Sequence, residues 1–395
     1  YPAVAMNPPY MGSRQMNADL KSYMKKHYPM SKRDLFAVFM EVGEQNTQLA
    51  GRLGMINQQS WMFLSSYEDL RTHVLDTTLI ESMLHMGPRT FDEIGGEVVQ
   101  STAFVLQNEL PQGQTGTYFR LVNENSSTAK KNAFESRQHR HSNVDQRDFE
   151  KIPGAPIAYW VPEEVITAFE EYPQLKETTK PRIGMRTGDN KRFLRQWSEV
   201  SWENTSVQCS DSDEAQATGK KWFPYNKGGG YKKWYGNQTF FVNWKNDGEE
   251  IKENTRQNYP NLSSLSWKIS NEEFYFKEGI TWSDISSGDF ACRHSPGGLI
   301  FDVKGSSAFP DREELFPVMG YLNSSFVTYT LHVLNPTMSY QVGNIRSLPY
   351  KRPTGEHREK IESTTRHCVT LSRRDFDSCE TSWDFTQHPL IQQNA

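Results

Sequence analysis

The chain has 395 residues, of which 23% are charged and 36% are apolar, and a formal net charge of −4. These values are typical of a soluble globular protein long enough for two or three domains, and the negative balance excludes a uniformly basic coat for nucleic acid. Because no stretch approaches about eighteen apolar residues and no signal-peptide pattern opens the chain, we expect a cytoplasmic location and no membrane partner.

Four cysteines are present, Cys209, Cys292, Cys368 and Cys379. They have neither the CxxC spacing nor the nearby histidine pair of a zinc site, and their pattern is not that of a disulfide framework. We therefore expect ordinary thiols and no metal site.

The first hundred or so residues alternate between strand and helix patterns. Apolar or β-branched runs predict strands, and apolar residues at helical spacing predict helices, the first of them with a start signal at Ser31. The predicted strands are 2–6, 51–61, 80–87 and 97–108, and the predicted helices are 31–48 and 66–76. Repeated β-α units favour a largely parallel sheet with helices on its faces, which is an α/β domain over about residues 1–150.

The rest of the chain differs in composition and in its pattern of predicted elements. Residues 112–149 are polar and predict a surface insertion or hairpin of the first domain, or a disordered stretch. Residues 151–180 are Pro-rich with one helix and suit a linker or brace. Short strands, glycines and aromatic residues predict an irregular α+β domain over 181–355, and a helical tail follows over 356–395.

The segment "VAMNPPYMG" ends an apolar strand at Asn7, Pro8, Pro9 and Tyr10. Two prolines stop the sheet, so the Asn7 amide and the Pro8 carbonyl are held at the carboxyl end of the strand, where open α/β sheets bind ligands. Two oxygen acceptors together suit an exocyclic amino group that becomes tetrahedral and positive as it attacks a methyl group. Tyr10 offers a flat face to a planar base, which a duplex exposes only when the base is flipped out. The alternative is a tight turn that merely closes a strand.

This tetrapeptide resembles the (Asn/Asp/Ser)-Pro-Pro-aromatic motif of amino-methyltransferases that use S-adenosylmethionine. Asn with Tyr is typical of DNA adenine-N6 enzymes and also occurs in methylases of RNA and of protein glutamine. The stretches "DLFAVFMEVG", "GRLGMINQQSW" and "HMGPRTFDEIGG" resemble the gamma class of adenine-N6 DNA methyltransferases, from the catalytic motif to the end of its Rossmann-like domain.

In that class an aromatic residue stacks on the second face of the flipped adenine, and the resemblance assigns this role to Phe91. The alternative is that Phe91 is a core residue that caps the sheet. The neighbouring Gly95-Gly96 pair is either a place where nucleic acid approaches closely or a hairpin turn.

The later sequence resembles the same family. "PRIGMRTGDNKRFLRQW" is similar to the opening of its target-recognition domain, and "GYLNSSFVTYTLHVLNPTMSYQVGNIRSLPY" is similar to its closing helix and strand. The likeness is greatest to large single-chain methylases of bacterial phage-exclusion (BREX-type) systems. It implies double-stranded DNA and other subunits of a defence complex as partners.

Basic and polar residues of this second domain are candidates for DNA contact. Most come from the cations of "RTGDNKRFLRQW" and from a Gly-rich basic window, and the alternative for them is a solvated surface. The candidates are Arg186, Lys191, Arg192, Arg195, Lys232, Lys233, Tyr340 and Gln341.

In the gamma class the Gly-rich cofactor motif precedes Asn-Pro-Pro-Tyr, and here Tyr1 lies within the strand that leads into that motif. No segment like "DPFxGSG" follows it. We therefore expect the carboxyl-terminal portion of a larger methyltransferase, without the half that holds most of S-adenosylmethionine, and no activity of the chain alone. Two other functions stay open: an RNA or protein-glutamine methylase, and a DNA- or protein-binding module with a non-functional motif.

Overall fold

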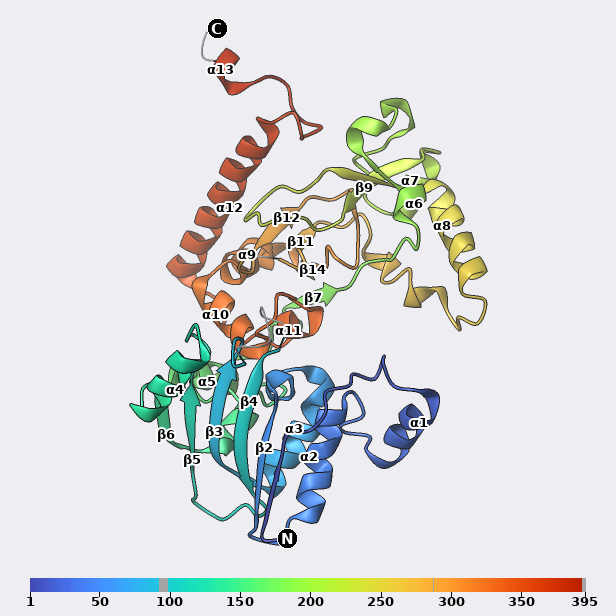
Figure 1. Ribbon diagram of the computed structural model, residues 1–395. Coiled ribbons are helices and arrows are strands. Elements are labelled where there is room, and N and C mark those ends of the chain that lie inside the picture. The colour runs from blue at the N-terminus through green and yellow to red at the C-terminus, as the bar shows by residue number, and fades with distance from the viewer. Residues whose placement is uncertain (92–98, 287, 393–395) are drawn as a thin grey trace. The chain divides into compact units, whose positions relative to one another are not determined.

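The computed structural model describes residues 1–91, 99–286 and 288–392 (Figure 1). The chain divides into two compact units, residues 1–171 and 172–395, and each is described by itself. None of the helices in the described ranges combines the length and the apolar character that crossing a membrane requires.

A six-stranded sheet with the order β1-β2-β4-β3-β5-β6 forms the first unit. Its strands are β1 (Ala3–Met6), β2 (Arg52–Gln58), β3 (Leu79–Gly87), β4 (Ser101–Gln107), β5 (Gly116–Arg120) and β6 (Arg140–Val144). Strand β1 pairs with β2, and β3 with β5, in parallel, while β2·β4, β3·β4 and β5·β6 are antiparallel. The sheet is therefore mixed, and the expectation of a largely parallel sheet was wrong. Strand β4 turns back beside β3, because the sequence between them carries Pro88 and Gly95-Gly96 rather than the pattern of a crossover helix.

The helices of this unit are α1 (Ala18–His27), α2 (Leu35–Asn46), α3 (Glu68–Thr77), α4 (Ser127–Glu135) and α5 (Glu163–Glu171). Apolar side chains of α2 and α3 meet those of β2, β3 and β4 in one core, in which Phe36, Leu70 and Ile80 are fully buried. Helix α2 begins after Asp34, not at Ser31 as predicted. The Asp34 side chain accepts a hydrogen bond from the Phe36 amide, whereas the Ser31 hydroxyl donates to the buried Glu41 carboxylate.

The polar segment 112–149, expected to form a surface insertion, contributes β5, α4 and β6 to this unit. Strand β5 lies inside the sheet between β3 and β6, and its Tyr118 is fully buried and stacks on Tyr159 with 4.6 Å between ring centroids. Only five residues, "GTYFR", form this strand. Such a short apolar run among polar neighbours is a weak local signal, and its burial comes from long-range pairing.

The second unit contains two four-stranded sheets, β13-β9-β10-β8 and β12-β11-β14-β7. The strands are β7 (Thr179–Arg182), β8 (Leu194–Gln196), β9 (Trp222–Asn226), β10 (Phe240–Asn243), β11 (Gly279–Trp282), β12 (Cys292–Ser295), β13 (Ile300–Phe301) and β14 (Ser307–Pro310). The helices are α6 (Asn190–Phe193), α7 (Ser212–Ala217), α8 (Lys245–Asn258), α9 (Leu315–Leu322), α10 (Ser325–Leu334), α11 (Val342–Arg346), α12 (Gly355–Asp377) and α13 (Pro389–Gln392). Short strands with separate helices agree with the expected irregular α+β architecture.

Aromatic side chains fill the core of the second unit, among them Phe223, Tyr225 and Trp244. After the long helix α12, shown in red in Figure 1, the chain returns to this unit. Trp383 packs on Phe241 with ring centroids 5.2 Å apart, and the Thr381 carbonyl accepts from the Trp197 indole at 2.9 Å. The aromatic end of the tail thus packs on the second unit.

Candidate functional site at the carboxyl edge of the first sheet

The Asn-Pro-Pro-Tyr motif directly follows β1, at the carboxyl end of the parallel pair β1·β2. Asn7 and Pro9 are exposed, Pro8 is buried and Tyr10 is half-buried. The Asn7 side chain makes no hydrogen bond to any of the described residues. Its amide oxygen is therefore available to a ligand, which is what the chemistry inferred from the sequence requires.

Asp34 holds the segment that follows the motif. Its Oδ1 atom accepts from the Met11 amide at 3.0 Å and from the Phe36 amide at 3.3 Å. The backbone adds two bonds, from the Leu35 amide to the Met11 carbonyl at 3.1 Å and from the Ser13 amide to the Arg33 carbonyl at 2.8 Å. Burial raises the pKa of Asp34, and its hydrogen bonds from backbone amides oppose that rise. The segment after Tyr10 is thus fixed to the start of α2.

The Tyr10 ring meets Phe36 edge-on, with 6.0 Å between centroids and 80° between planes. Burial raises the pKa of the Tyr10 hydroxyl, and the nearby Asp34 charge adds to the rise, so the side chain is neutral at ordinary pH. An open pocket of about 530 Å³ lies beside this ring. Its lining residues are Tyr10, Gly12, Ser13, Arg14, Gln15, Arg33, Asp34 and Gln58.

Phe91 lies at the same edge of the sheet. Strand β3 runs antiparallel to β4, and β4 antiparallel to β2, so β3 ends where β1 and β2 end. Phe91 follows that end and is half-buried. The structure therefore brings Tyr10 and Phe91 to one edge, separated in the sheet by β2 and β4. The Gly95-Gly96 pair lies outside the described residues.

A buried polar chain that the sequence analysis did not identify also lies at this edge. The Gln59 side chain donates to Gln100 at 2.5 Å and accepts from His85 Nε2 at 2.8 Å, and His85 Nδ1 lies 3.3 Å from the Tyr159 hydroxyl. Because the amide oxygen of Gln59 can only accept, His85 carries its proton on Nε2 and Nδ1 accepts from Tyr159. Burial, with the nearby cations Arg120 and Lys130, lowers the pKa of His85 to about 3. These hydrogen bonds connect the ends of β2 and β3 with the start of β4.

The cations predicted in "RTGDNKRFLRQW" are exposed or half-exposed in the second unit. The Arg192 guanidinium lies 3.5 Å from Glu250, and the Arg195 guanidinium donates to the Lys191 carbonyl at 2.6 Å. Arg186 donates to the Trp267 carbonyl at 3.5 Å. Lys191 and Arg192 lie on the short helix α6, which Asp189 caps. All three arginines thus have partners within this unit, and their contact with DNA stays a prediction.

The other predicted DNA contacts differ in their surroundings. Lys232 and Gln341 are exposed, and the Lys233 ammonium donates to the Asn323 carbonyl at 3.2 Å. Tyr340 is only 3% exposed, its hydroxyl donates to the Gly288 carbonyl at 3.2 Å, and its own carbonyl accepts from the Trp282 indole at 2.8 Å. The fold therefore uses Tyr340 as a core side chain.

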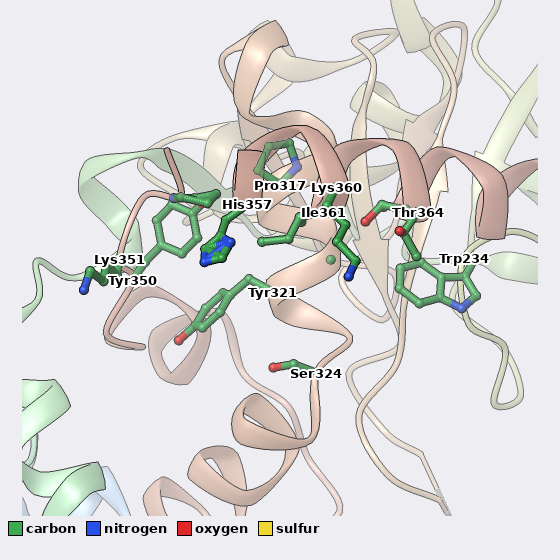
Figure 2. Close-up of a pocket in the computed structure, with 13 residues that line it drawn as sticks. Trp234, Pro317, Tyr321, Ser324, Tyr350, Lys351, His357, Lys360, Ile361 and Thr364 are labelled. Carbon is green, nitrogen blue, oxygen red and sulfur yellow. The ribbon is translucent and has the colours of Figure 1, made fainter. Parts of the chain in front are cut away.

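A second cavity, of about 590 Å³, lies entirely within the second unit between α9 and the first half of α12. Figure 2 shows His357, Lys360 and Ile361 of α12 near Tyr321 of α9. Aromatic and aliphatic side chains form much of its wall, and its basic lining residues are Lys351, His357 and Lys360. None of the predicted DNA contacts lines it.

No group of three or more His, Cys, Asp or Glu side chains in the described ranges is arranged to hold a metal ion. All four cysteines are free. Burial raises the pKa of Cys292 to about 12, so that thiol is unreactive at ordinary pH.

The parallel strand pair ends at one edge, where the exposed Asn7 amide and the two aromatic residues also lie. Comparison with known proteins indicates the class of protein. Residues 1–91 match the family described as Eco57I restriction-modification methylase. The whole chain is 42% identical to the adenine-specific methyltransferase PglX of Lacticaseibacillus casei (strain Zhang) and 37% identical to the adenine-specific methyltransferase BrxX of Escherichia coli O9:H4 (strain HS).

These alignments include 100% of this chain but only 33% and 31% of the two relatives, so the chain spans about a third of their length. The resemblance to adenine-specific methyltransferases is confirmed. Among solved structures, the fold is similar to that of the Type IIL restriction-modification enzyme MmeI in complex with DNA, with a TM-score of 0.60 over 99% of this chain and 52% of that one, at 11% identity. The Type ISP enzyme LlaGI has a TM-score of 0.51 over 94% of this chain and 41% of its own, also at 11% identity.

Proposed function

We propose that this chain is the catalytic and target-recognition part of a site-specific DNA methyltransferase that modifies adenine N6 in bacterial phage defence. The Asn7 amide is exposed at the carboxyl edge of the sheet and has no hydrogen-bond partner among the described residues, and this observation supports the proposal most directly. Similarity to PglX and BrxX over the whole chain supports the adenine specificity. In this proposal double-stranded DNA is the substrate, and subunits of a defence complex are the partners.

The residues present suit the amino group of an extruded adenine. The Asn7 amide oxygen and the Pro8 carbonyl accept its two hydrogens, and this favours the tetrahedral nitrogen that develops during methyl transfer. Tyr10 and Phe91 hold the base plane by stacking. S-adenosylmethionine supplies the methyl group, and its main binding motif lies, in this proposal, in a part of the enzyme outside these residues.

The test is Asn7→Ala in a complete methyltransferase that contains this chain. Loss of one preorganised hydrogen-bonding group at a reacting centre reduces turnover by about 100- to 1,000-fold. We expect methylation to fall by at least that factor while DNA binding stays unchanged. Asn46→Ala is the matched control, because Asn46 is an exposed asparagine at the end of α2 and lies outside this edge. Persistent methylation in the Asn7 variant would show that the role assigned to Asn7 is wrong.

Sequencing that detects modified bases, applied to DNA from cells with the intact enzyme, tests the substrate. We expect N6-methyladenine at one recurrent sequence. Modified RNA or protein glutamine with unmodified DNA would favour the other methylases that carry this motif. DNA binding without any methylation would leave only a recognition module.

A further inference from the structure

The open pocket beside Tyr10 carries two arginines whose charges none of the described residues neutralises. Arg14 and Arg33 both line it and are both exposed. Neither guanidinium forms an ion pair or a side-chain hydrogen bond with any residue in the described part of the chain. Two other exposed arginines of the first unit do have acidic partners, since Arg52 lies 2.8 Å from Glu81 and Arg147 lies 2.6 Å from Asp145.

Among the described residues, Asp34 is the one acidic residue that lines this pocket. Its Oδ1 atom is occupied by the amides of Met11 and Phe36, and the side chain is 9% exposed. With two guanidiniums and one carboxylate, the described lining residues have a formal charge of 2 − 1 = +1. The pocket therefore favours an anion, and its exposed charges are the positive ones.

Backbone hydrogen bonds hold the two arginines near each other. The Ser13 amide donates to the Arg33 carbonyl at 2.8 Å, the Gln15 amide donates to the Gly12 carbonyl at 2.9 Å, and Gly12 pairs with Asp34 as an isolated bridge. The segment carrying Arg14 is thus fixed to the segment carrying Arg33. Two cations held by ordered backbone form a preorganised site, which lowers the entropic cost of binding.

The side chain of Tyr10, beside these two arginines, indicates which class of ligand they bind. Tyr10 lines the same pocket, so an aromatic surface and two guanidiniums lie together, as the base and the phosphate do in a nucleotide. Guanidinium groups bind phosphate in a bidentate manner. We propose that Arg14 and Arg33 bind the phosphate of the nucleotide whose base stacks on Tyr10. This inference rests on the proposed function and assigns a backbone-phosphate site to it.

The first experiment measures the affinity of the complete enzyme for its recognition duplex at several salt concentrations, for Arg14→Gln, Arg33→Gln and the double variant. Each lost phosphate contact reduces the slope of log K against log salt concentration by about 0.9. We expect that change for each variant and about twice that change for the double variant. Arg52→Gln is the control, because Arg52 is an exposed arginine at the amino end of β2, the opposite edge of the sheet.

The second experiment places the contact at the extruded nucleotide. In one duplex the phosphate next to the target adenine is replaced by a neutral methylphosphonate. We expect the wild type and Arg52→Gln to bind it about tenfold more weakly than the normal duplex, whereas the double variant should bind both duplexes equally. If the double variant instead lost affinity for both duplexes and still bound the methylphosphonate duplex more weakly, the arginines would contact another phosphate, and the inference would be overturned.

Circular dichroism checks that each variant is folded. Arg14→Lys and Arg33→Lys are expected to keep the slope of log K against log salt concentration, because they keep the positive charge. Variants that behave like Arg52→Gln on both duplexes would refute the phosphate site while the Asn7→Ala result stands. Persistent methylation in Asn7→Ala would instead refute the proposed function, whatever the arginine variants show.

Discussion

His85 is a buried imidazole that the fold keeps neutral. It is 3% exposed, and its two nitrogens are used by Gln59 and Tyr159. A proton added to Nδ1 would cost the hydrogen bond from Tyr159 and would place a charge in a buried site. The histidine therefore contributes a fixed hydrogen-bond direction at the edge of the sheet rather than acid-base chemistry.

This burial predicts an acid-sensitive stability. Because the folded pKa is about 3 and the ordinary value is 6.5, the unfolded state binds more protons between these values. The free energy of unfolding should therefore fall as pH decreases from 6.5 towards 3, by up to about 1.4 kcal/mol per pH unit from this group. Urea titrations at several pH values should show a shallower fall in His85→Gln than in the wild type. His73→Gln is the control, since His73 is only partly buried; an equal slope in His85→Gln and the wild type would contradict this account.

Two buried arginines offer a direct comparison. Arg71 is 1% exposed and donates to the carbonyls of Trp61, Leu64 and Gly154 at 2.6–3.1 Å. Arg293 is 2% exposed, reaches only the Ser283 hydroxyl at 3.4 Å, and leaves Nε without a partner in the described residues. Burial lowers the pKa of both to about 10, so both remain charged at pH 7.

The difference in partners predicts opposite effects of the same substitution. Arg71→Met removes a donor from three carbonyl groups, of which only that of Leu64 keeps another among the described residues, and we expect it to reduce the free energy of unfolding by about 3 kcal/mol or more. Arg293→Met removes a costly buried charge and little hydrogen bonding, so we expect a change within about 1 kcal/mol or a gain in stability. Urea denaturation of the purified chain measures both. An equal loss in the two variants would mean that Arg293 has a stabilising partner.

At the scale of elements, Gly320 sets the approach of α9 to α12. A Cβ atom built there would lie 2.7 Å from the Thr365 hydroxyl and 3.1 Å from the Ile361 side chain, both on α12. The backbone of α9 thus packs directly on α12 beside the cavity of Figure 2. A larger side chain at this position has to push the helices apart.

We expect Gly320→Val to lower the free energy of unfolding by about 1–3 kcal/mol and to change the α9–α12 cavity. Gly343→Ala is the matched control, because Gly343 lies in α11 and a Cβ atom there meets nothing within 4 Å. That control should be neutral or slightly stabilising, by up to about 1 kcal/mol, since alanine favours helix. Equal stability of Gly320→Val and the wild type in urea would show that α12 adjusts freely.

The sequence predicted elements best where the signal was local. Strand β1, helix α3 and strand β3 agree closely with prediction, and the proline pair correctly marked where β1 ends. Strand β5 and the mixed sheet were missed, because both depend on pairing between distant segments. Gln59 and His85 meet for the same reason: β4 inserts between β2 and β3 and brings their ends together. A lone histidine in an apolar strand gives no sign of such a partner.

At the scale of the whole molecule, the two units have separate cores and different architectures. The candidate catalytic edge belongs to the first unit and the predicted cation cluster to the second. Under the proposed function, the first unit provides acceptors for an amino group, stacking surfaces and two arginines without an acidic partner among the described residues, which suit a nucleotide substrate. The role of this chain in cofactor binding is therefore expected to be minor.

Calorimetric titration of residues 1–395 with S-adenosylmethionine tests this division. We expect weak or undetectable binding and no turnover on DNA, because the main cofactor motif lies elsewhere in the proposed enzyme. A complete methyltransferase measured under the same conditions is the positive control. Micromolar affinity in the 395-residue chain would contradict the proposal.

Asp34 has a consequence that extends beyond its own neighbourhood. The same oxygen that caps α2 also restrains Met11, directly after the motif. Fraying of the first turn of α2 would therefore remove one bond that holds the segment after the motif, in addition to the backbone bonds made by Leu35 and Ser13. Under the proposed function, a weaker cap at this position would loosen the helix end and the nucleotide site together.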